Sequence, residues 1–202
     1  MKNLCKDKFR PKGMGNHYSS SECVKNVYSL FMTKFTIRQA RFIRRPVYIR
    51  GGNSLSGCKG LTTGRFCRFD LEGSRHTLYI GDNCEMGDMT HIVAHEKVII
   101  GNNVLMASKC FISDTDHGAY KGDIQDGPAI FPNKRRLITK PVSIGNNVWI
   151  GENAVILAGS QIGDGCIIGA NSVIRGFIPD NSIVVGNNRI IKRWSHDQEA
   201  WD

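Results

Sequence analysis

The sequence has no uninterrupted apolar run of 18 residues, which excludes an ordinary membrane-spanning helix. It has no CxxC pair, and its seven cysteines are an odd number, which argues against a disulfide framework and against a zinc ribbon. Residues 1–20 are charged and contain no apolar core, so a secretory signal is not expected. These absences together favour a reducing cytoplasm as the location.

Positive charge is concentrated at one end of the chain. Residues 1–50 contain twelve Lys/Arg and two acidic residues, a balance of +10, whereas the remainder contains 15 basic and 16 acidic residues, a balance of −1. The basic quarter is either a solvated surface or a surface that attracts an anionic partner, so peripheral membrane association through this N-terminus stays an open alternative. No aromatic-basic motif accompanies the charge, and nucleic acid is therefore not an expected partner.

A six-residue repeat dominates the rest of the sequence. From Ile144, six consecutive hexads open with Ile, four of them continue with Gly, and the fifth place usually holds a small or β-branched residue. The same register starts at Ile80 and Ile100, with a weaker echo at Leu55. A period of six is neither helical nor simple strand alternation. It predicts an all-β parallel solenoid with three hexads per coil, and five coils would span about 24 Å.

Two features of the repeat bear on function. Cys84, Cys110 and Cys166 all stand at the small fifth place, so we expect buried thiols that act as small hydrophobic residues. Residues 113–143 interrupt the repeat with a loop that contains three prolines, and His117 lies at the break. A loop of this length in a compact domain is usually functional. Because imidazole titrates near neutral pH and can accept or donate a proton there, we single out His117 as a candidate functional residue.

Several motifs resemble one known family. They are "SDTDHG" (113–118), the hexads of residues 140–174, "IPDNSIVVGN" (178–187), and the lead-in segments "FMTKF" (31–35) and "RRPVYIR" (44–50). Over residues 24–193 the chain resembles the left-handed β-helix acetyltransferases, particularly the bacterial O-acetyltransferases that modify surface polysaccharides such as O-antigen or capsule. The resemblance implies a left-handed parallel β-helix, a homotrimer, acetyl-CoA as co-substrate, a saccharide acceptor and no metal.

The resemblance also assigns roles to individual residues. It makes His117 the general base, although relatives in the polysaccharide branch often have a second histidine where this chain has Thr115. It implies that acetyl-CoA is bound between neighbouring subunits by Trp149, Ala158, Gly159, Ala170, Arg175, Arg189 and Lys192. Two departures affect the phosphate contacts: Arg175-Gly176 replaces the family's Thr-Lys, and "GNNRIIK" replaces its Gly-x-Pro-Ala segment.

Acceptor contacts and domain boundaries complete the expectations. Asp88, His91 and Arg135 are the candidates for binding the acceptor; Gly87 stands where galactoside acetyltransferase has a sugar-binding Asn. We expect a basic N-terminal segment over residues 1–45, the β-helix domain over 46–190 and a tail, a short helix or an arm, over 191–202. Apolar residues at helical spacing over residues 24–35 predict an amphipathic helix whose apolar face caps the open end of the solenoid, or alternatively lies on a membrane.

Other functions remain open at this stage. The acceptor could be a small sugar or a xenobiotic instead of a polysaccharide. A γ-type carbonic anhydrase uses the same solenoid and three His ligands, for which His91, His95 and His117 are available, but two of that family's ligands are five residues apart instead of four. A purely structural solenoid is the third class, and the long His-bearing loop argues against it.

Overall fold

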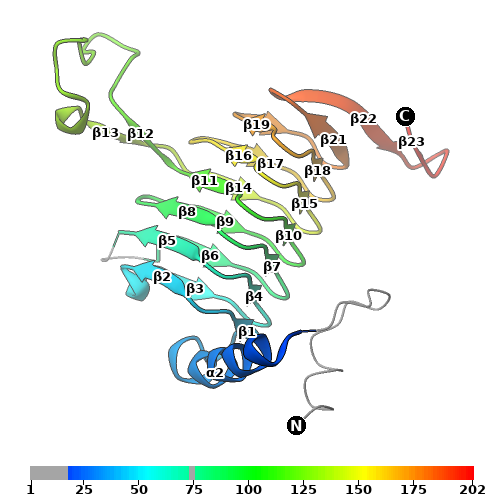
Figure 1. Cartoon of the computed structure of the whole chain (residues 1–202). Coiled ribbons are helices and arrows are strands. Elements are labelled where there is room, and N and C mark those ends of the chain that lie inside the picture. The colour runs from blue at the N-terminus through cyan, green and yellow to red at the C-terminus, as the bar shows by residue number, and fades with distance from the viewer. Residues whose placement is uncertain (1–17, 73–75) are drawn as a thin grey trace.

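The computed structural model describes residues 18–72 and 76–202, and its body is a three-sided parallel β-solenoid (Figure 1). The first face contains β1 (Phe42–Ile43), β4 (Thr62–Thr63), β7 (Glu85–Met86), β10 (Leu105–Met106), β15 (Trp149–Ile150), β18 (Ile167–Ile168) and β21 (Ser182–Val185). The second face contains β2 (Val47–Arg50), β5 (Cys67–Leu71), β8 (His91–Ala94), β11 (Phe111–Ser113), β16 (Val155–Ile156) and β19 (Val173–Ile174). The third face contains β3 (Leu55–Gly57), β6 (Leu78–Ile80), β9 (Val98–Ile100), β14 (Val142–Ile144), β17 (Gln161–Ile162) and β20 (Phe177–Ile178).

One coil consists of one strand from each face, so that β1, β2 and β3 form the first coil and β10, β11 and β14 form the fourth. Within the described residues the first face holds seven parallel strands, two more than the five coils that the clear hexads predict. The two further strands lie at opposite ends of this face: β1 precedes the hexad register that starts at Leu55, and β21 follows the last hexad, which ends at residue 179. Strand pairing therefore begins at Phe42, four residues before the predicted boundary at residue 46.

The core is built from the inward residue of each hexad. On the third face Ile80 pairs with Ile100, Ile100 with Ile144 and Ile144 with Ile162, and all of these side chains are buried. Each corner needs a residue that accepts a left-handed backbone, and Asn147, with φ of 56°, provides one such corner. From residue 144 to 174 a buried Ile recurs every six residues, with a left-handed Asn or Gly at the corners between them, which confirms the parallel solenoid predicted from the sequence.

The buried thiols give the first testable prediction. Burial raises the pKa of the Cys58 thiol to about 12 and the pKa of both Cys67 and Cys110 to about 11. Because the thiolate is the reactive form, we expect these thiols to resist a thiol-specific reagent at pH 8 until the protein is unfolded in denaturant. Stability that depends on the neutral thiols is present below the unfolded pKa of about 8.5 and is lost as the pH rises towards 11. Rapid labelling of Cys110 in the native protein would contradict the packing described.

Helix α2 (Ser20–Thr36) covers the N-terminal end of the solenoid (Figure 1). Its first turn is fixed by a capping box between Ser19 and Glu22. The helix and its place over the open end of the solenoid were predicted, but the expectation that its apolar face packs on the solenoid is wrong. The buried residues of the helix are the polar Asn26, Ser29 and Thr33. Among the described residues, no helix has the length and apolar character needed to cross a bilayer.

The remaining elements extend from the solenoid. In the C-terminal tail, β22 (Arg189–Ser195) pairs antiparallel with β21, and β23 (Ala200–Trp201) pairs antiparallel with β22. An excursion between β11 and β14 contains β12 (Thr115–His117) and β13 (Leu137–Thr139). Two short 3₁₀ turns, η1 (Gly52–Ser54) and η2 (Pro132–Lys134), complete the described structure.

Candidate functional site

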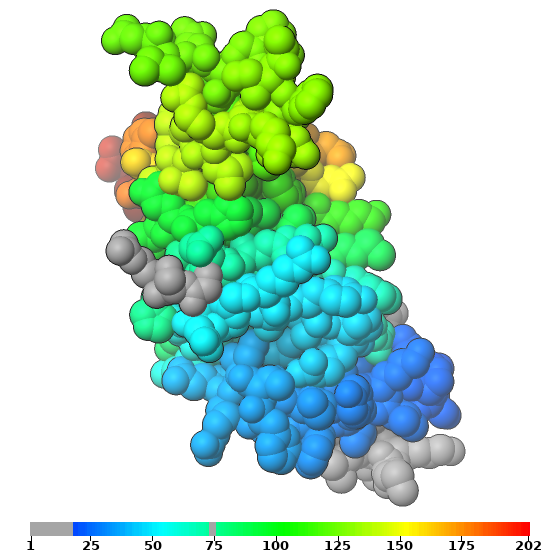
Figure 2. Space-filling view, turned by 90° about the vertical axis from the view of Figure 1, so that its left-hand side faces the viewer, coloured from blue at the N-terminus to red at the C-terminus, as the bar shows by residue number. Residues whose placement is uncertain are grey.

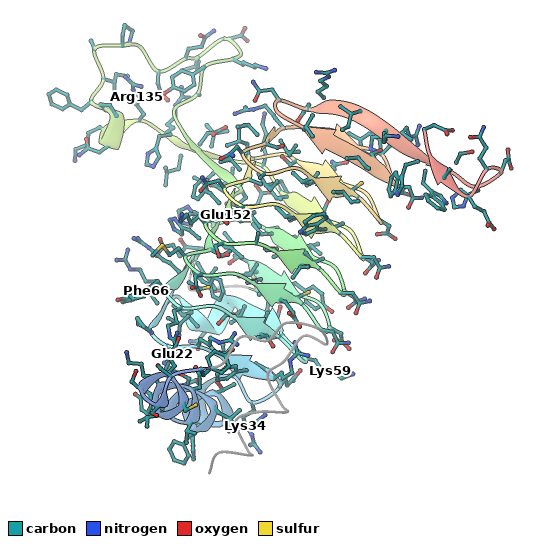
Figure 3. All side chains as sticks on the ribbon, turned by 45° about the vertical axis from the view of Figure 1, so that its right-hand side comes forward. Glu22, Lys34, Lys59, Phe66, Arg135 and Glu152 are labelled. Carbon is teal, nitrogen blue, oxygen red and sulfur yellow. The ribbon has the colours of Figure 1, made fainter. Side chains whose placement is uncertain are left out.

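The excursion of residues 114–141, here called the arm, leaves the fourth coil at the corner between the second and third faces. Its base is an antiparallel ribbon in which Thr115 pairs with Thr139 and His117 with Leu137. Figure 2 shows the arm projecting beyond the body of the solenoid, and Figure 3 places Arg135 in its outer part. The structure thus confirms that the break in the hexad pattern marks a segment that extends beyond the solenoid wall.

His117 lies at the end of the ribbon with an exposed side chain. Its carbonyl accepts a hydrogen bond of 2.6 Å from the Tyr120 hydroxyl, and the Gly118 amide donates to the Arg136 carbonyl, so the backbone around it is held in place. In the described residues the imidazole ring itself has no hydrogen-bond partner. An imidazole on a fixed backbone with both ring nitrogens available is suited to accept a proton from a bound hydroxyl group.

A buried carboxylate anchors the base of the arm. Asp114 is fully buried and accepts backbone hydrogen bonds from the amides of His95, Glu96 and Lys97, at 3.0, 2.7 and 2.8 Å. The Thr115 hydroxyl lies 2.7 Å from the same carboxylate and 3.2 Å from Nδ1 of His95. The carboxylate can only accept, so the Thr115 hydroxyl donates to Asp114 and accepts from His95. This chain of bonds places the proton of His95 on Nδ1 and leaves Nε2 as a proton acceptor.

This arrangement brings two histidines to one side of the arm. Side chains two residues apart on a strand point to the same side, so Thr115 and His117 face the same way. Because Thr115 contacts His95, His117 lies on the His95 side of the ribbon. Sequence reasoning missed Asp114 and considered His95 only as a candidate metal ligand; the alternation of Thr115 and His117 was the available signal for the side of the ribbon that they share. His95 thus supplies a second imidazole beside Thr115.

The opposite side of the ribbon faces the C-terminal coils. Asp116 lies 4.0 Å from Arg175, and the Gly159 amide donates to the Lys140 carbonyl at 3.1 Å. Ala158 is buried beside Gly159 at the same corner of the fifth coil. The structure therefore brings Ala158, Gly159 and Arg175 together next to the arm. The long ion pair with Asp116 leaves the Arg175 guanidinium about 61% exposed.

The other residues expected to contact acetyl-CoA lie elsewhere in the same chain. Trp149 points outward from the first face between Leu105 and Ile167 and is 51% exposed. Figure 3 shows the side chains that line this wall of the prism. Three more of the expected acetyl-CoA residues lie away from the base of the arm. Ala170 is exposed at the corner between the first and second faces, and Arg189 and Lys192 are exposed on β22. His117 and Trp149 thus occupy different sides of one prism, and one chain does not bring them together.

The predicted acceptor residues also lie in separate parts of the chain, Asp88 and His91 on the solenoid and Arg135 in the arm. His91 donates from Nε2 to Asp70 at 3.0 Å on the outer surface of the second face. Burial would raise the pKa of Asp70, but hydrogen bonds from His91 and Arg68 outweigh it and lower that pKa. Asp88 accepts the Arg65 amide at 2.6 Å, which links neighbouring coils. Arg135 binds within the arm, donating to the Tyr120 hydroxyl and the Ile130 carbonyl.

The alternative of a metal centre gains no support from this geometry. His91 is engaged by Asp70, and His95 by Thr115. Within residues 18–72 and 76–202, no group of three or more His, Cys, Asp or Glu side chains is placed to hold a metal ion.

Comparisons with known proteins agree on the type of protein. Residues 141–176 match the family described as bacterial transferase hexapeptide (six repeats). The chain is 38% identical to a putative lipopolysaccharide biosynthesis O-acetyl transferase, WbbJ, of Escherichia coli K12, over 94% of this chain and 97% of the relative. It is 30% identical to the galactoside O-acetyltransferase of the same strain, over 85% of this chain and 69% of the relative.

Solved structures support the same fold. AntD, an N-acyltransferase from Bacillus cereus crystallised with dTDP and 3-hydroxybutyryl-CoA, superposes with a TM-score of 0.65 over 92% of this chain and 93% of that chain. The two sequences are 20% identical, so this likeness concerns the fold. Together with the hexapeptide match, it confirms the predicted hexapeptide-repeat β-helix.

Proposed function

The chain belongs to the hexapeptide-repeat O-acetyltransferases, and we propose that it transfers the acetyl group of acetyl-CoA to a sugar hydroxyl of a bacterial surface polysaccharide or of its precursor. The single observation that carries this proposal is the arm, which holds an imidazole outside the solenoid wall, on a chain that is alike over nearly its whole length to a lipopolysaccharide O-acetyl transferase. The reaction needs acetyl-CoA, which favours the cytoplasm as its location.

His117 acts as the general base in the proposed mechanism. A sugar hydroxyl is a weak nucleophile at neutral pH, and the imidazole accepts its proton as the oxygen attacks the carbonyl carbon of the thioester. A tetrahedral intermediate forms, the C–S bond then breaks, and the proton passes from the imidazolium to the sulfur of coenzyme A. The thioester is already activated, so no acetyl-enzyme is required, and the shielded Cys110 and Cys166 thiols have no part in the reaction.

His95 has a supporting role on the acceptor side. Asp114 and Thr115 hold its ring with Nε2 available as an acceptor, facing the same side of the arm as His117. We place a second hydroxyl of the acceptor sugar at this nitrogen, so that the reacting hydroxyl is oriented towards His117. A polar group pre-oriented by a buried carboxylate lowers the entropic cost of binding a sugar in one pose.

The complete site requires a second copy of the chain. The arm and the corner residues Gly159 and Arg175 form one wall, whereas Trp149, Arg189 and Lys192 lie on a different side of the prism. A homotrimer with parallel prisms would place the arm of one copy over the first face of the next. The pantetheine and the acetyl group would then lie in the groove between them, and the exposed guanidinium of Arg175 would be available to the phosphates.

The test is acetyl transfer itself. We expect the purified protein to release coenzyme A from acetyl-CoA slowly on its own and rapidly when a suitable saccharide is present, with one acetyl group added to the saccharide in its mass spectrum. The acceptor panel contains surface polysaccharide fragments, lipid-linked repeats, simple galactosides and maltosides, and chloramphenicol as a xenobiotic. Turnover of none of these, or transfer only to amines, would contradict the proposal.

A further inference from the structure

Helix α2 presents an apolar stripe to solvent. Its members are Val24, Val27, Tyr28, Phe31 and Phe35, with exposed fractions of 70, 66, 55, 61 and 69%. The Phe31 and Phe35 rings lie against each other with centroids 4.7 Å apart. A contiguous exposed patch of five large apolar side chains is unusual for a surface that meets only water, and such patches mark interaction sites.

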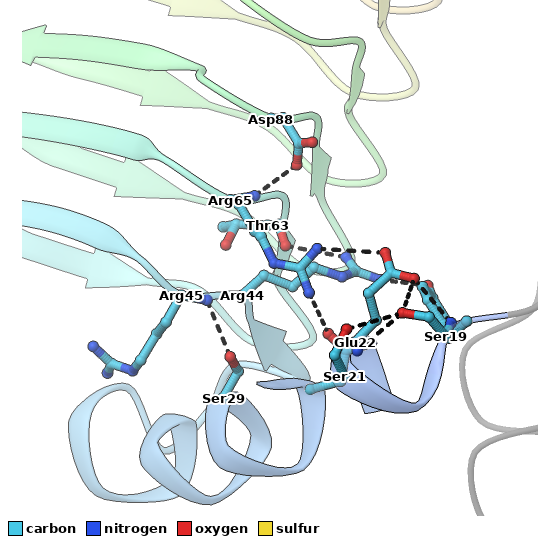
Figure 4. Close-up of polar contacts among 11 residues, drawn as sticks. Ser19, Ser21, Glu22, Ser29, Arg44, Arg45, Thr63, Arg65 and Asp88 are labelled. Atoms are coloured by element: carbon cyan, nitrogen blue, oxygen red, sulfur yellow. Dashed lines mark hydrogen bonds and ion pairs between the residues drawn. The ribbon is translucent and has the colours of Figure 1, made fainter. Parts of the chain in front are cut away.

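The rotation of the helix that exposes the stripe is fixed by hydrogen bonds on its other side. The Ile43 amide donates to the Thr33 hydroxyl at 3.0 Å, and the Arg45 amide donates to the Ser29 hydroxyl at 3.1 Å. Arg65 donates to the Asn26 side chain at 3.1 Å. Figure 4 shows the bond between Arg45 and Ser29. Thr33 and Ser29 satisfy backbone donors of the first coil that a parallel solenoid leaves open at its end, and Asn26 binds the guanidinium of Arg65 from the second coil. Turning the apolar stripe inward would break all three bonds.

The stripe therefore points along the solenoid axis, away from the body. By the helical period of 3.6 residues, the stripe lies diametrically opposite the buried Asn26, Ser29 and Thr33. Because α2 lies across the end of the prism (Figure 1), a neighbour packed beside the prism would not cover the stripe. In a parallel trimer three such stripes would face the same direction and form one flat end.

Charge indicates what this end meets. Lys25 and Lys34 border the stripe on its two sides by the same helical period, and Arg38 follows the helix with an exposed side chain. Residues 1–50 carry a balance of +10, against −1 for the remainder. This charge disfavours end-to-end contact with a second copy, whose end would be equally basic. An apolar stripe bordered by lysines is the pattern of helices that lie in an anionic membrane interface.

We propose that α2 docks the enzyme on an anionic lipid surface, with the helix in the membrane plane and the apolar stripe among the acyl chains. The arm leaves the fourth coil, about 14 Å along the axis from the first, and so stays in water. The solenoid would stand on the membrane with its catalytic arm raised above it. Docking is a property of the helix and does not depend on which acceptor is acetylated.

Co-sedimentation with lipid vesicles tests this proposal. The full-length protein is expected to bind vesicles that contain phosphatidylglycerol and to bind pure phosphatidylcholine vesicles much more weakly, with the difference reduced by salt. The double variant F31S/F35S removes two apolar side chains from the exposed stripe, so its binding should fall about tenfold or more. Phe177→Ser is the matched control, since Phe177 is 69% exposed near the other end of the solenoid, and it should bind like the wild type.

Three results would overturn the proposal. The first is wild-type protein that does not bind anionic vesicles. The second is F31S/F35S that binds as well as wild type, which would assign binding to basic charge alone. The third is concentration-dependent end-to-end assembly of the wild type that F31S/F35S abolishes, which would make a second copy the occupant. Turnover of a soluble acceptor should be equal in wild type and F31S/F35S, which shows that the variant is folded.

Discussion

Replacement of His117 by Ala is expected to lower kcat by a factor of about 10² to 10⁴, the contribution typical of a positioned general base. The side chain is exposed at the end of the ribbon and takes no part in the core, so the loss should leave the folded structure and the affinity for coenzyme A unchanged. His117→Asn should be equally impaired, because an amide does not accept the proton of the hydroxyl. The measurements are kcat on one acceptor and calorimetric binding of coenzyme A.

His91→Ala is the control for this experiment. His91 is a partly exposed histidine that is held by Asp70 on the outer surface of the second face, so its loss should alter the acceptor KM or the stability more than kcat. Near-normal kcat in His117→Ala would contradict the mechanism. A loss of kcat confined to His91→Ala would move the base from the arm to the solenoid wall.

Replacement of Asp114 by Ala is expected to have the largest effect on stability. The change leaves the partly buried amides of His95, Glu96 and Lys97 without their acceptor, and a donor left unsatisfied away from water costs about 1–3 kcal/mol. The arm begins at this residue, so its base would loosen and kcat would fall as well. We expect a free energy of unfolding reduced by about 3 kcal/mol or more, measured by denaturant titration, together with reduced turnover.

Asp114→Asn and Thr115→Val separate the two roles of this cluster. The amide of Asn keeps one oxygen acceptor but turns an NH₂ group towards donors, so its stability should fall between those of wild type and Asp114→Ala. Thr115→Val keeps the shape but removes the hydroxyl between Asp114 and His95, and it should raise the acceptor KM, whereas Thr115→Ser should retain wild-type values. Wild-type stability in Asp114→Ala would contradict the anchoring role.

Much of the fold follows from local sequence rules. Inward Ile residues such as Ile144 and Ile162, and small residues such as Cys166, recur at fixed places of the hexads. Their period fits a three-sided coil, so the sequence was sufficient to predict the solenoid. The break around His117 was equally readable, because the segment that follows it has three prolines and no Ile-Gly pair of the kind that opens the hexads. The predicted number of coils was too low, because β1 and β21 lie outside the readable hexads.

Other features depend on contacts that period alone does not reveal. The spacing of α2 defines an apolar and a polar side but not which of them is buried. At the end of the solenoid the open backbone donors of Ile43 and Arg45 select the hydroxyls of Thr33 and Ser29. The carboxylate of Asp114, after the fourth coil's β11, accepts the amides of residues 95–97, which follow the third coil's β8. This contact depends on how the two coils are aligned, which the sequence period alone does not give.

Trp149 shows the limit of sequence reasoning about the site. Its side chain points outward and is about half exposed, but the hexad pattern does not reveal that the first face lies on a different side of the prism from the arm. The separation of Trp149 from His117 within one chain is the reason that the proposed site involves two copies.

Subunit mixing tests the shared site most directly. Trp149→Ala is expected to lower kcat/KM by about tenfold or more, because truncating a large aromatic side chain at a binding surface commonly costs over about 1.4 kcal/mol. Chains with His117→Ala and chains with Trp149→Ala are co-expressed with different tags, and assemblies that contain both are purified. If the arm of one copy works with the first face of another, some interfaces pair an intact His117 with an intact Trp149. The mixed assemblies should then show turnover well above the mean of the two parent variants. Turnover equal to that mean, or full activity of a stable monomer, would contradict a site formed between copies.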